Sequence, residues 1–220
     1  DLDLAQLCQQ HEAAPADTQA TLLLRDNPNP KLFPPISLDA SDRVVGLRGE
    51  VFGSPAEVRD FMFTGVHVIA PALLDRLPTG ESDVLAAAYR PALLEGARMQ
   101  GVRLTGYFEE HSTPARYLAG NLALLRQPTL LKAAPGPLTG VDPAAKVSAA
   151  ATLQPPYRIA AGAVVEAGAV VGPDVVVDTG GVVSAGARIS RAVVWTGGVA
   201  RGDVAEAIVT EDGLVNAAAS

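Results

Sequence analysis

The stretch IAAGAVVEAGAVVGPDVVV, residues 159–177, decides the fold of one part of this chain. An aliphatic residue recurs in it at every sixth position, and a mostly small residue follows four places after each. The same spacing continues on both sides and keeps these positions in register: Val141, Val147, Leu153, Ile159, Val165, Val171, Val177, Val183, Ile189 and Trp195. This hexapeptide repeat predicts a left-handed parallel β-helix, assigned to residues 141–220, with roughly three coils between residues 141 and 199.

Each position of the repeat has a physical reason. The aliphatic residue points into a narrow interior and stacks on its equivalents in neighbouring coils, while the small residue fits beside a corner. Glycines such as Gly162 and Gly198 suit turns that need unusual backbone angles. We expect Trp195 to continue the interior column or to pack at the end of a coil, and the segment 205–209 to cap the stack.

The β-helix allows two functional interpretations. Many acyltransferases use a similar helix with a histidine at an inter-subunit site, but the sequence after residue 141 contains no histidine. The other interpretation is a scaffolding or oligomerisation element, since a valine-rich edge coil offers unpaired strand backbone to a partner subunit. We therefore expect a homo-oligomer formed through the β-helix. The acyltransferase interpretation would be supported only if acyl-CoA protected the β-helix against thermal unfolding.

Composition excludes several other classes. The chain of 220 residues has a net charge of -7 and few lysines, which argues against nucleic acid as a partner, because a phosphate backbone requires clustered Lys and Arg. No apolar run reaches the roughly 18 residues of a membrane span, so we expect no membrane partner and a cytoplasmic location. Cys8 stands alone and is expected to be a buried thiol.

The segment 1–125 alternates between helix and strand patterns and predicts an α/β domain, joined to the repeat by a Pro- and Gly-rich linker, 126–140. Strands are predicted at 20–24, 43–47 and 61–69. Helices are predicted after Pro71, from Ser82, and from Thr113, where a Thr N-cap and a following proline are the expected start of a helix.

Three stretches of this domain carry a resemblance: FTGVHVIAP (63–71), GYFEEHSTP (106–114) and RYLAGN (116–121). In order and spacing they resemble the second half of sugar-1-phosphate nucleotidyltransferases such as mannose-1-phosphate guanylyltransferases. The resemblance implies a partial Rossmann-like nucleotide-diphospho-sugar transferase domain, and a C-terminal left-handed β-helix is common in the same proteins. It also implies a reaction in which an NTP and a sugar 1-phosphate give an NDP-sugar and pyrophosphate, usually with Mg²⁺.

The resemblance also assigns roles to residues. Thr64 and Gly65 fall where the family's backbone approaches the sugar, and Glu110 falls where relatives carry an aspartate that helps to hold the metal. Glu110 is therefore expected to belong to the sugar-binding site and to bind Mg²⁺. His111 is open between a phosphate contact and a packing role. The family's glycine-rich nucleotide loop would precede Asp1, so we expect this chain to be inactive alone and to contain no catalytic residue of its own.

Departures from the family keep an alternative open. The Glu-Lys-Pro of relatives is replaced by VGLRGEV at 45–51, which leaves Arg48 or Arg59 as possible cations, and Phe63 replaces an asparagine. These differences favour a catalytically silent regulatory or scaffolding subunit that pairs with an active homologue. Asp1 and Asp3 have the spacing of a metal-binding Asp-x-Asp pair, but acidic residues also suit a helix start.

Overall fold

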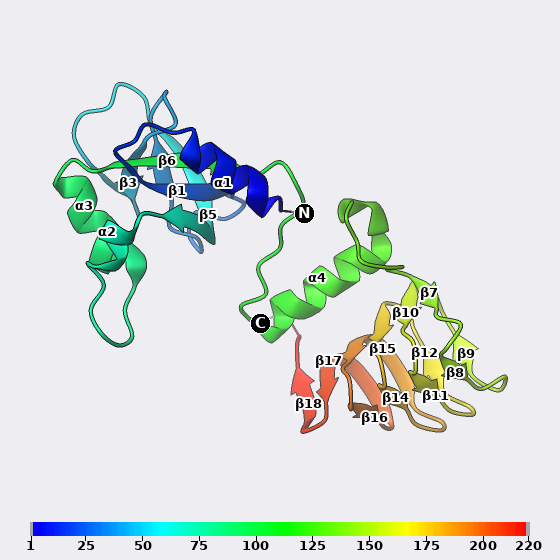
Figure 1. The fold of residues 1–220 in the computed structure, drawn as a ribbon. Helices are drawn as coiled ribbons and strands as arrows, with labels where there is room; N and C mark the ends of the chain where they lie inside the picture. The colour runs from blue at the N-terminus through cyan, green and yellow to red at the C-terminus, as the bar shows by residue number, and fades with distance from the viewer. Residues whose placement is uncertain (1, 219–220) are drawn as a thin grey trace. The chain divides into compact units, whose positions relative to one another are not determined.

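The computed structural model describes residues 2–218 and divides into two compact units (Figure 1). The first comprises Leu2–Gly106 and the second begins at Tyr107. This division differs from the expected boundary at residue 125. The reason is that helix α4 (Pro114–Arg126) buries its leucines against strands of the second unit.

The first unit is built on a six-stranded sheet of order β4-β3-β2-β5-β1-β6. Its strands are β1 (Thr18–Asp26), β2 (Ile36–Leu38), β3 (Val44–Leu47), β4 (Glu50–Val51), β5 (Arg59–Ile69) and β6 (Arg98–Arg103). Among these, β1 and β6 run parallel and the other pairs run antiparallel. The three predicted strands are present as β1, β3 and β5. The sheet is mixed, and a doubly wound parallel arrangement does not show in its pairing.

The helices of this unit are short: α1 (Leu4–Glu12), α2 (Pro71–Leu74), the π-helical turn η1 (Leu85–Tyr89) and α3 (Arg90–Leu94). The carboxylate of Asp3 caps α1 by accepting from Gln6 N–H at 3.0 Å, while Asp1 lies outside the described residues. Asp83, and not Ser82, accepts the first N–H groups of η1. Cys8 is exposed, which corrects the expected buried thiol, because α1 buries Leu7.

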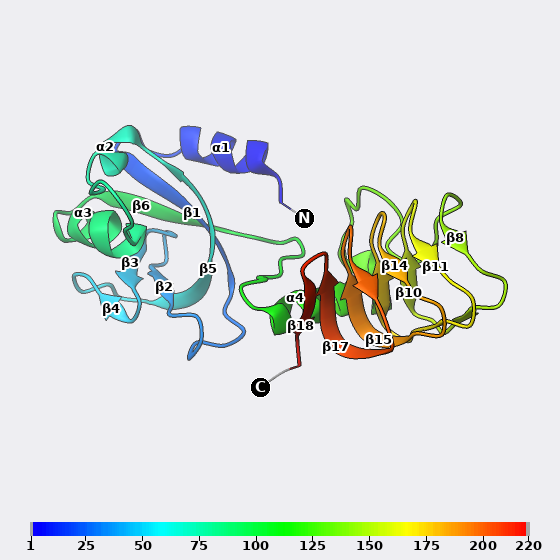
Figure 2. The ribbon, with the colours of Figure 1, turned by 90° about the horizontal axis from the view of Figure 1, so that it is seen from below.

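The second unit is a parallel β-solenoid of about four turns, consistent with the predicted left-handed β-helix (Figure 2). Its strands follow the repeat: β7 (Gly140–Val141), β8 (Lys146–Val147), β9 (Thr152–Leu153), β10 (Tyr157–Ile159), β11 (Val164–Val165), β12 (Val170–Val171), β13 (Val175–Val177), β14 (Val182–Val183), β15 (Arg188–Val194), β16 (Val199–Ala200), β17 (Asp203–Thr210) and β18 (Gly213–Asn216). A 3-10 turn, η2 (Pro128–Leu130), follows α4.

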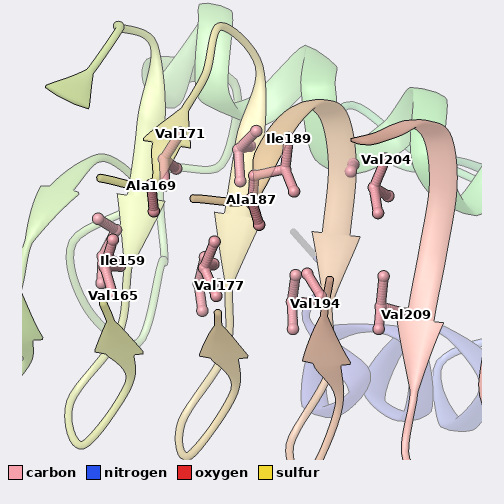
Figure 3. Close-up of a cluster of buried hydrophobic side chains, with 14 of the residues drawn as sticks. Ile159, Val165, Ala169, Val171, Val177, Ala187, Ile189, Val194, Val204 and Val209 are labelled. Carbon is pink, nitrogen blue, oxygen red and sulfur yellow. The ribbon is translucent and has the colours of Figure 1, made fainter. Parts of the chain in front are cut away.

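The interior of the solenoid holds stacked aliphatic columns (Figure 3). Along one column Ile159 is followed by Val177, Val194 and Val209, all buried. Trp195 is therefore not part of this column, and it is 40% exposed. The reason is that the coil from Val177 to Val194 is one residue shorter than the coil from Ile159 to Val177. The inward position therefore falls on Val194 and not on Trp195.

The end of the stack also differs from the expectation. Strand β17, which includes the segment expected to cap, pairs in parallel with β15 and places Val204 and Val209 in the interior. The segment 205–209 therefore continues the solenoid instead of capping it. The solenoid has about four turns, whereas roughly three were expected. The last strand is β18, which turns back antiparallel on β17.

Helix α4 packs against the solenoid through apolar contacts and an ion pair. Leu118, Leu122 and Leu125 pack against Val193 and Ile208 on the outer side of β15 and β17. At its C-terminal end, Arg126 donates two hydrogen bonds to the carboxylate of Asp174, whose side chain is only 9% exposed. Thr113 caps the helix by accepting from Arg116 N–H at 3.2 Å, as predicted.

None of the helices in the described part of the chain has the length and apolar character that crossing a membrane requires.

Candidate functional site

The predicted sugar-binding residues lie at an irregularity of strand β5. Leu22 pairs with His67 and Leu24 pairs with Phe63, so β5 carries extra residues opposite Leu23. Thr64 holds this bulge: its hydroxyl donates to Leu23 C=O at 2.8 Å and accepts from the N–H of Val66 at 3.3 Å. Bulges are over-represented beside active sites, where they re-aim backbone and side chains.

Gly65 lies at the tip of this bulge. It is exposed, its φ is +82°, and no atom lies within 4 Å of the position that a Cβ would take. The backbone angle rather than crowding therefore explains why a glycine occupies this position. The result is a short piece of bare, accessible backbone within an otherwise packed sheet.

A buried tyrosine contacts the same strand. The hydroxyl of Tyr89, a residue with no exposed surface, lies 2.7 Å from Nδ1 of His67. Burial lowers the pKa of His67 and raises the pKa of Tyr89. Both shifts favour a neutral imidazole that accepts the phenolic proton at Nδ1. Phe63 completes the cluster, with its ring centroid 5.6 Å from that of His67.

This cluster predicts a pH dependence of stability. Burial lowers the pKa of His67 in the folded state, whereas the unfolded chain protonates it near about pH 6.5, so the unfolded state binds more protons around that pH. The free energy of unfolding is therefore expected to fall as the pH drops from about 8 to about 5.5. Urea unfolding across this range would measure it.

The matched variant is His67→Gln, which retains a polar group but does not titrate. Its unfolding free energy should fall less over the same range, and equal slopes for both proteins would show that His67 does not contribute. The carboxyls whose pKa values are lowered by arginine partners, those of Glu50, Asp83 and Glu95, titrate below this range and so do not enter the comparison.

Glu110 belongs to the second unit, in the segment that leads into α4. Its carboxylate pairs with the guanidinium of Arg116, which also donates to the hydroxyl of Ser112 at 2.8 Å. The next residue, His111, packs edge-on against Tyr117 at 5.5 Å between ring centroids. The ring also lies over Gly120, where a Cβ would come within 2.5 Å of Nε2. His111 therefore has a packing role on α4 in this structure.

The residues around Glu110 can be tested as ligands for Mg²⁺. Within residues 2–218, no three His, Cys, Asp or Glu side chains gather at one place. The carboxylate of Glu110 is already paired with a cation, Arg116, which opposes a second positive charge. Mg²⁺ is usually held by one or two carboxylates together with substrate phosphates. By themselves these residues do not fit a magnesium site, and the role of Glu110 as a metal ligand stays a prediction.

The two arginines considered as cations for the sugar phosphate are both engaged in the first unit. Arg48 pairs with Asp83, and Arg59 donates to Asp42 at 2.9 Å and to the C=O of Asp39 at 2.6 Å. Arg48 sits at the turn of the β3–β4 hairpin with a φ of +54°. These ion pairs join the hairpin to the neighbouring loops. If either guanidinium bound the phosphate of a sugar phosphate, it would have to release its carboxylate partner.

A hollow of about 620 Å³ lies elsewhere on the first unit, between the β3–β4 hairpin and α3. Its lining includes Glu50, Val51 and Leu94 and does not include Thr64 or Gly65. The hollow and the bulge are therefore separate features of this unit.

The structure brings some predicted residues together and not others. Thr64 and Gly65 share the bulge, and His67 follows on the same strand, whereas Glu110 belongs to the other unit. Tyr89 was not singled out as a partner of this strand, because helical spacing indicates only that it faces a core. No signal in the sequence joined it to His67. No protein-family model matches this sequence, and no curated protein matches it either.

Proposed function

We propose that this chain is the sugar-binding side and the assembly element of a sugar-1-phosphate nucleotidyltransferase. The parent would convert an NTP and a sugar 1-phosphate to an NDP-sugar and pyrophosphate. The first unit would then be the back half of a Rossmann-like nucleotide-diphospho-sugar transferase domain. The observation that carries the proposal is the bulge at Thr64–Val66, which exposes Gly65 where the family resemblance expects backbone to meet the sugar.

The chemistry left to this chain is binding and orientation. The N–H and C=O groups of an exposed bulge can hydrogen-bond sugar hydroxyls, and the missing Cβ of Gly65 lets the ligand approach. The sequence has no Gly-x-Gly-x-x-Gly and no Gly-Lys-Ser/Thr loop, so the nucleotide site is assigned to a half that precedes this chain in the parent. The chain alone is therefore expected to be inactive, and Mg²⁺ remains a prediction for the parent.

Assembly is the second part of the proposal. In the first coil of the solenoid, β7, β8 and β9 each pair with a strand on one side, and Val141 is 41% exposed. An open edge of this kind can receive a second copy, which supports a homo-oligomer formed through the solenoid.

A second candidate function is a catalytically silent regulatory or scaffolding subunit of such an enzyme. It is supported by the engagement of Arg48 and Arg59 with carboxylates and by the ion pair of Glu110 with Arg116. In that case the fold would be retained while the charges that catalysis needs are used for structure.

The variant Gly65→Ala in the parent tests the sugar-binding role. Its Cβ would lie in open space at the bulge, where we expect the sugar, so the KM for sugar 1-phosphate should rise about tenfold. Gly53→Ala is the matched control, because Gly53 has a φ of +73° and equally open surroundings. Both variants carry a similar backbone strain, but the control should keep its KM. An equal change in both, or none in Gly65→Ala, would remove Gly65 from the site.

A further inference from the structure

The hollow of about 620 Å³ between the β3–β4 hairpin and α3 has the size of a small-molecule site. Ligand pockets usually measure about 300–1,000 Å³ and combine an apolar lining with a few polar groups. The apolar part of this lining includes Val51 and Leu94, which are 43% and 58% exposed, beside the more buried Phe52 and Leu93. A ligand with an apolar body would cover Val51 and Leu94 and remove their surface from water.

The two carboxylates of the lining already have partners. Glu50 accepts two hydrogen bonds from the guanidinium of Arg90, at 2.7 and 2.8 Å, and this ion pair joins the hairpin to α3 across the hollow. The carboxylate of Asp39 accepts from the N–H groups of Ser41 and Arg43 in its own turn, at 2.8 and 3.0 Å. Neither carboxylate therefore requires a cation from a ligand.

The arginine of the lining, Arg43, differs from these carboxylates. It is half-buried, its guanidinium donates to the C=O of Gly96 at 3.3 Å, and within residues 2–218 it forms no ion pair. Other arginines of this unit do have carboxylate partners: Arg48, Arg59, Arg76, Arg90 and Arg103. A half-buried guanidinium loses part of its hydration, and a bound anion would compensate for that loss through charge-assisted hydrogen bonds.

We propose that this hollow binds a small amphipathic anion, with a carboxylate or phosphate head group on Arg43 and an apolar body against Val51 and Leu94. A neutral apolar molecule would leave the guanidinium without a counter-charge. A small inorganic anion would leave the apolar surface in water. The hollow is separate from the bulge at Thr64–Val66, and the inference goes beyond the proposed function without depending on it.

A titration of the isotope-labelled chain with hexyl phosphate, followed by amide NMR spectra, tests the proposal. The probe combines an apolar chain with an anionic head group. The amide signals of Arg43, Val51 and Leu94 should shift and saturate, while those of Thr64 and Gly65 stay unchanged. Hexanol lacks the charge and inorganic phosphate lacks the apolar chain, so each should bind at least about tenfold more weakly. Hexanoate distinguishes the two head groups: binding of either anion supports the site, and the tighter one identifies its head group.

Two variants, each with a matched control, test the contacts. Arg43→Gln should weaken binding of hexyl phosphate about tenfold, because it removes charge-assisted hydrogen bonds. Arg98→Gln is its control, since Arg98 is also half-buried in the first unit but does not line the hollow. Leu94→Ala should weaken binding about fivefold through lost apolar contact. Leu74→Ala is its control, because Leu74 ends α2 as Leu94 ends α3, is 50% exposed and lies outside the lining.

Three outcomes would overturn the proposal. The first is a set of lining signals that do not shift, the second is equal affinity for hexanol and hexyl phosphate, and the third is an equal loss of affinity in the control variants. The titration measures binding by this chain and not the activity of the parent. Failure of the site would therefore leave the proposed nucleotidyltransferase as it stands, and an inactive parent would leave the site.

Discussion

Replacement of Gly172 by alanine is expected to prevent the solenoid from folding in its present register. A Cβ at this position would lie 1.8 Å from the carbonyl oxygen of Gln154, and the backbone has a φ of +111°. The contact atom is backbone, and Gln154 is itself fixed because its N–H donates to Val171 C=O at 2.7 Å. The clash can be relieved only by separating two coils, so we expect a loss on the order of 4 kcal/mol or more.

Gly180→Ala is the matched control for this substitution. Gly180 also has a positive φ, +71°, but no atom lies within 4 Å of its Cβ position. It therefore carries the strain of the left-handed region alone, which costs about 1–2 kcal/mol. Thermal unfolding followed by circular dichroism would compare the variants. A Gly172→Ala protein as stable as Gly180→Ala would contradict the close approach of the two coils.

The second large effect is expected from Val165→Asp. Val165 is 1% exposed and lies in an interior column between Val147 and Val183. A carboxylate there would have no cation or hydrogen-bond donor beside it in an aliphatic interior. Burial of an unpaired charge is among the most destabilising changes known, and we expect a loss on the order of 4 kcal/mol or more.

The preceding residue provides the control. Val164 has the same side chain but points outward and is only half-buried, with Lys146 as one strand neighbour. Val164→Asp should therefore change the unfolding free energy by about 1 kcal/mol or less, and the lysine can pair with the new carboxylate. Chemical denaturation of the two variants measures the difference. If both were equally destabilised, the alternation of inward and outward residues along β11 would be wrong.

The solenoid could be predicted from sequence because its period is short and its interior is uniform. Stacking places equivalent residues of successive coils in one column, so each repeat adds independent support to the same register. The predicted interior column failed where that period breaks, at the shortened coil between Val177 and Val194, and the predicted cap at 205–209 failed because β17 continues the solenoid. An aromatic residue in phase, Trp195, concealed the break. In the structure its Nε1 donates to the hydroxyl of Tyr117 at 3.0 Å, outside the column.

In the first unit the positions of several strands and helices could be predicted from the sequence, whereas the contacts between them could not. Buried apolar runs locate β1 and β5, and the proline at the start of α2 marks a helix. The bulge at Thr64–Val66 depends on the register between two strands distant in sequence, which no local pattern encodes. The contact of Tyr89 with His67 has the same origin, because it joins a helical turn to a strand.

The candidate site shows a related limit. The resemblance assigned a metal to Glu110 from its position in a motif, whereas the structure pairs it with Arg116 in the first turn of α4. Whether Glu110 binds a metal or forms an ion pair depends on the neighbouring side chains, and within the described residues no group of three potential ligands forms there.

Pyrophosphate release by the parent, measured with each NTP against a panel of sugar 1-phosphates and Mg²⁺, tests the central claim most directly. We expect release that depends on one sugar phosphate, while this chain alone gives none. No release with any pair, from a parent shown to be folded, would contradict the enzyme and would leave the silent regulatory or scaffolding subunit.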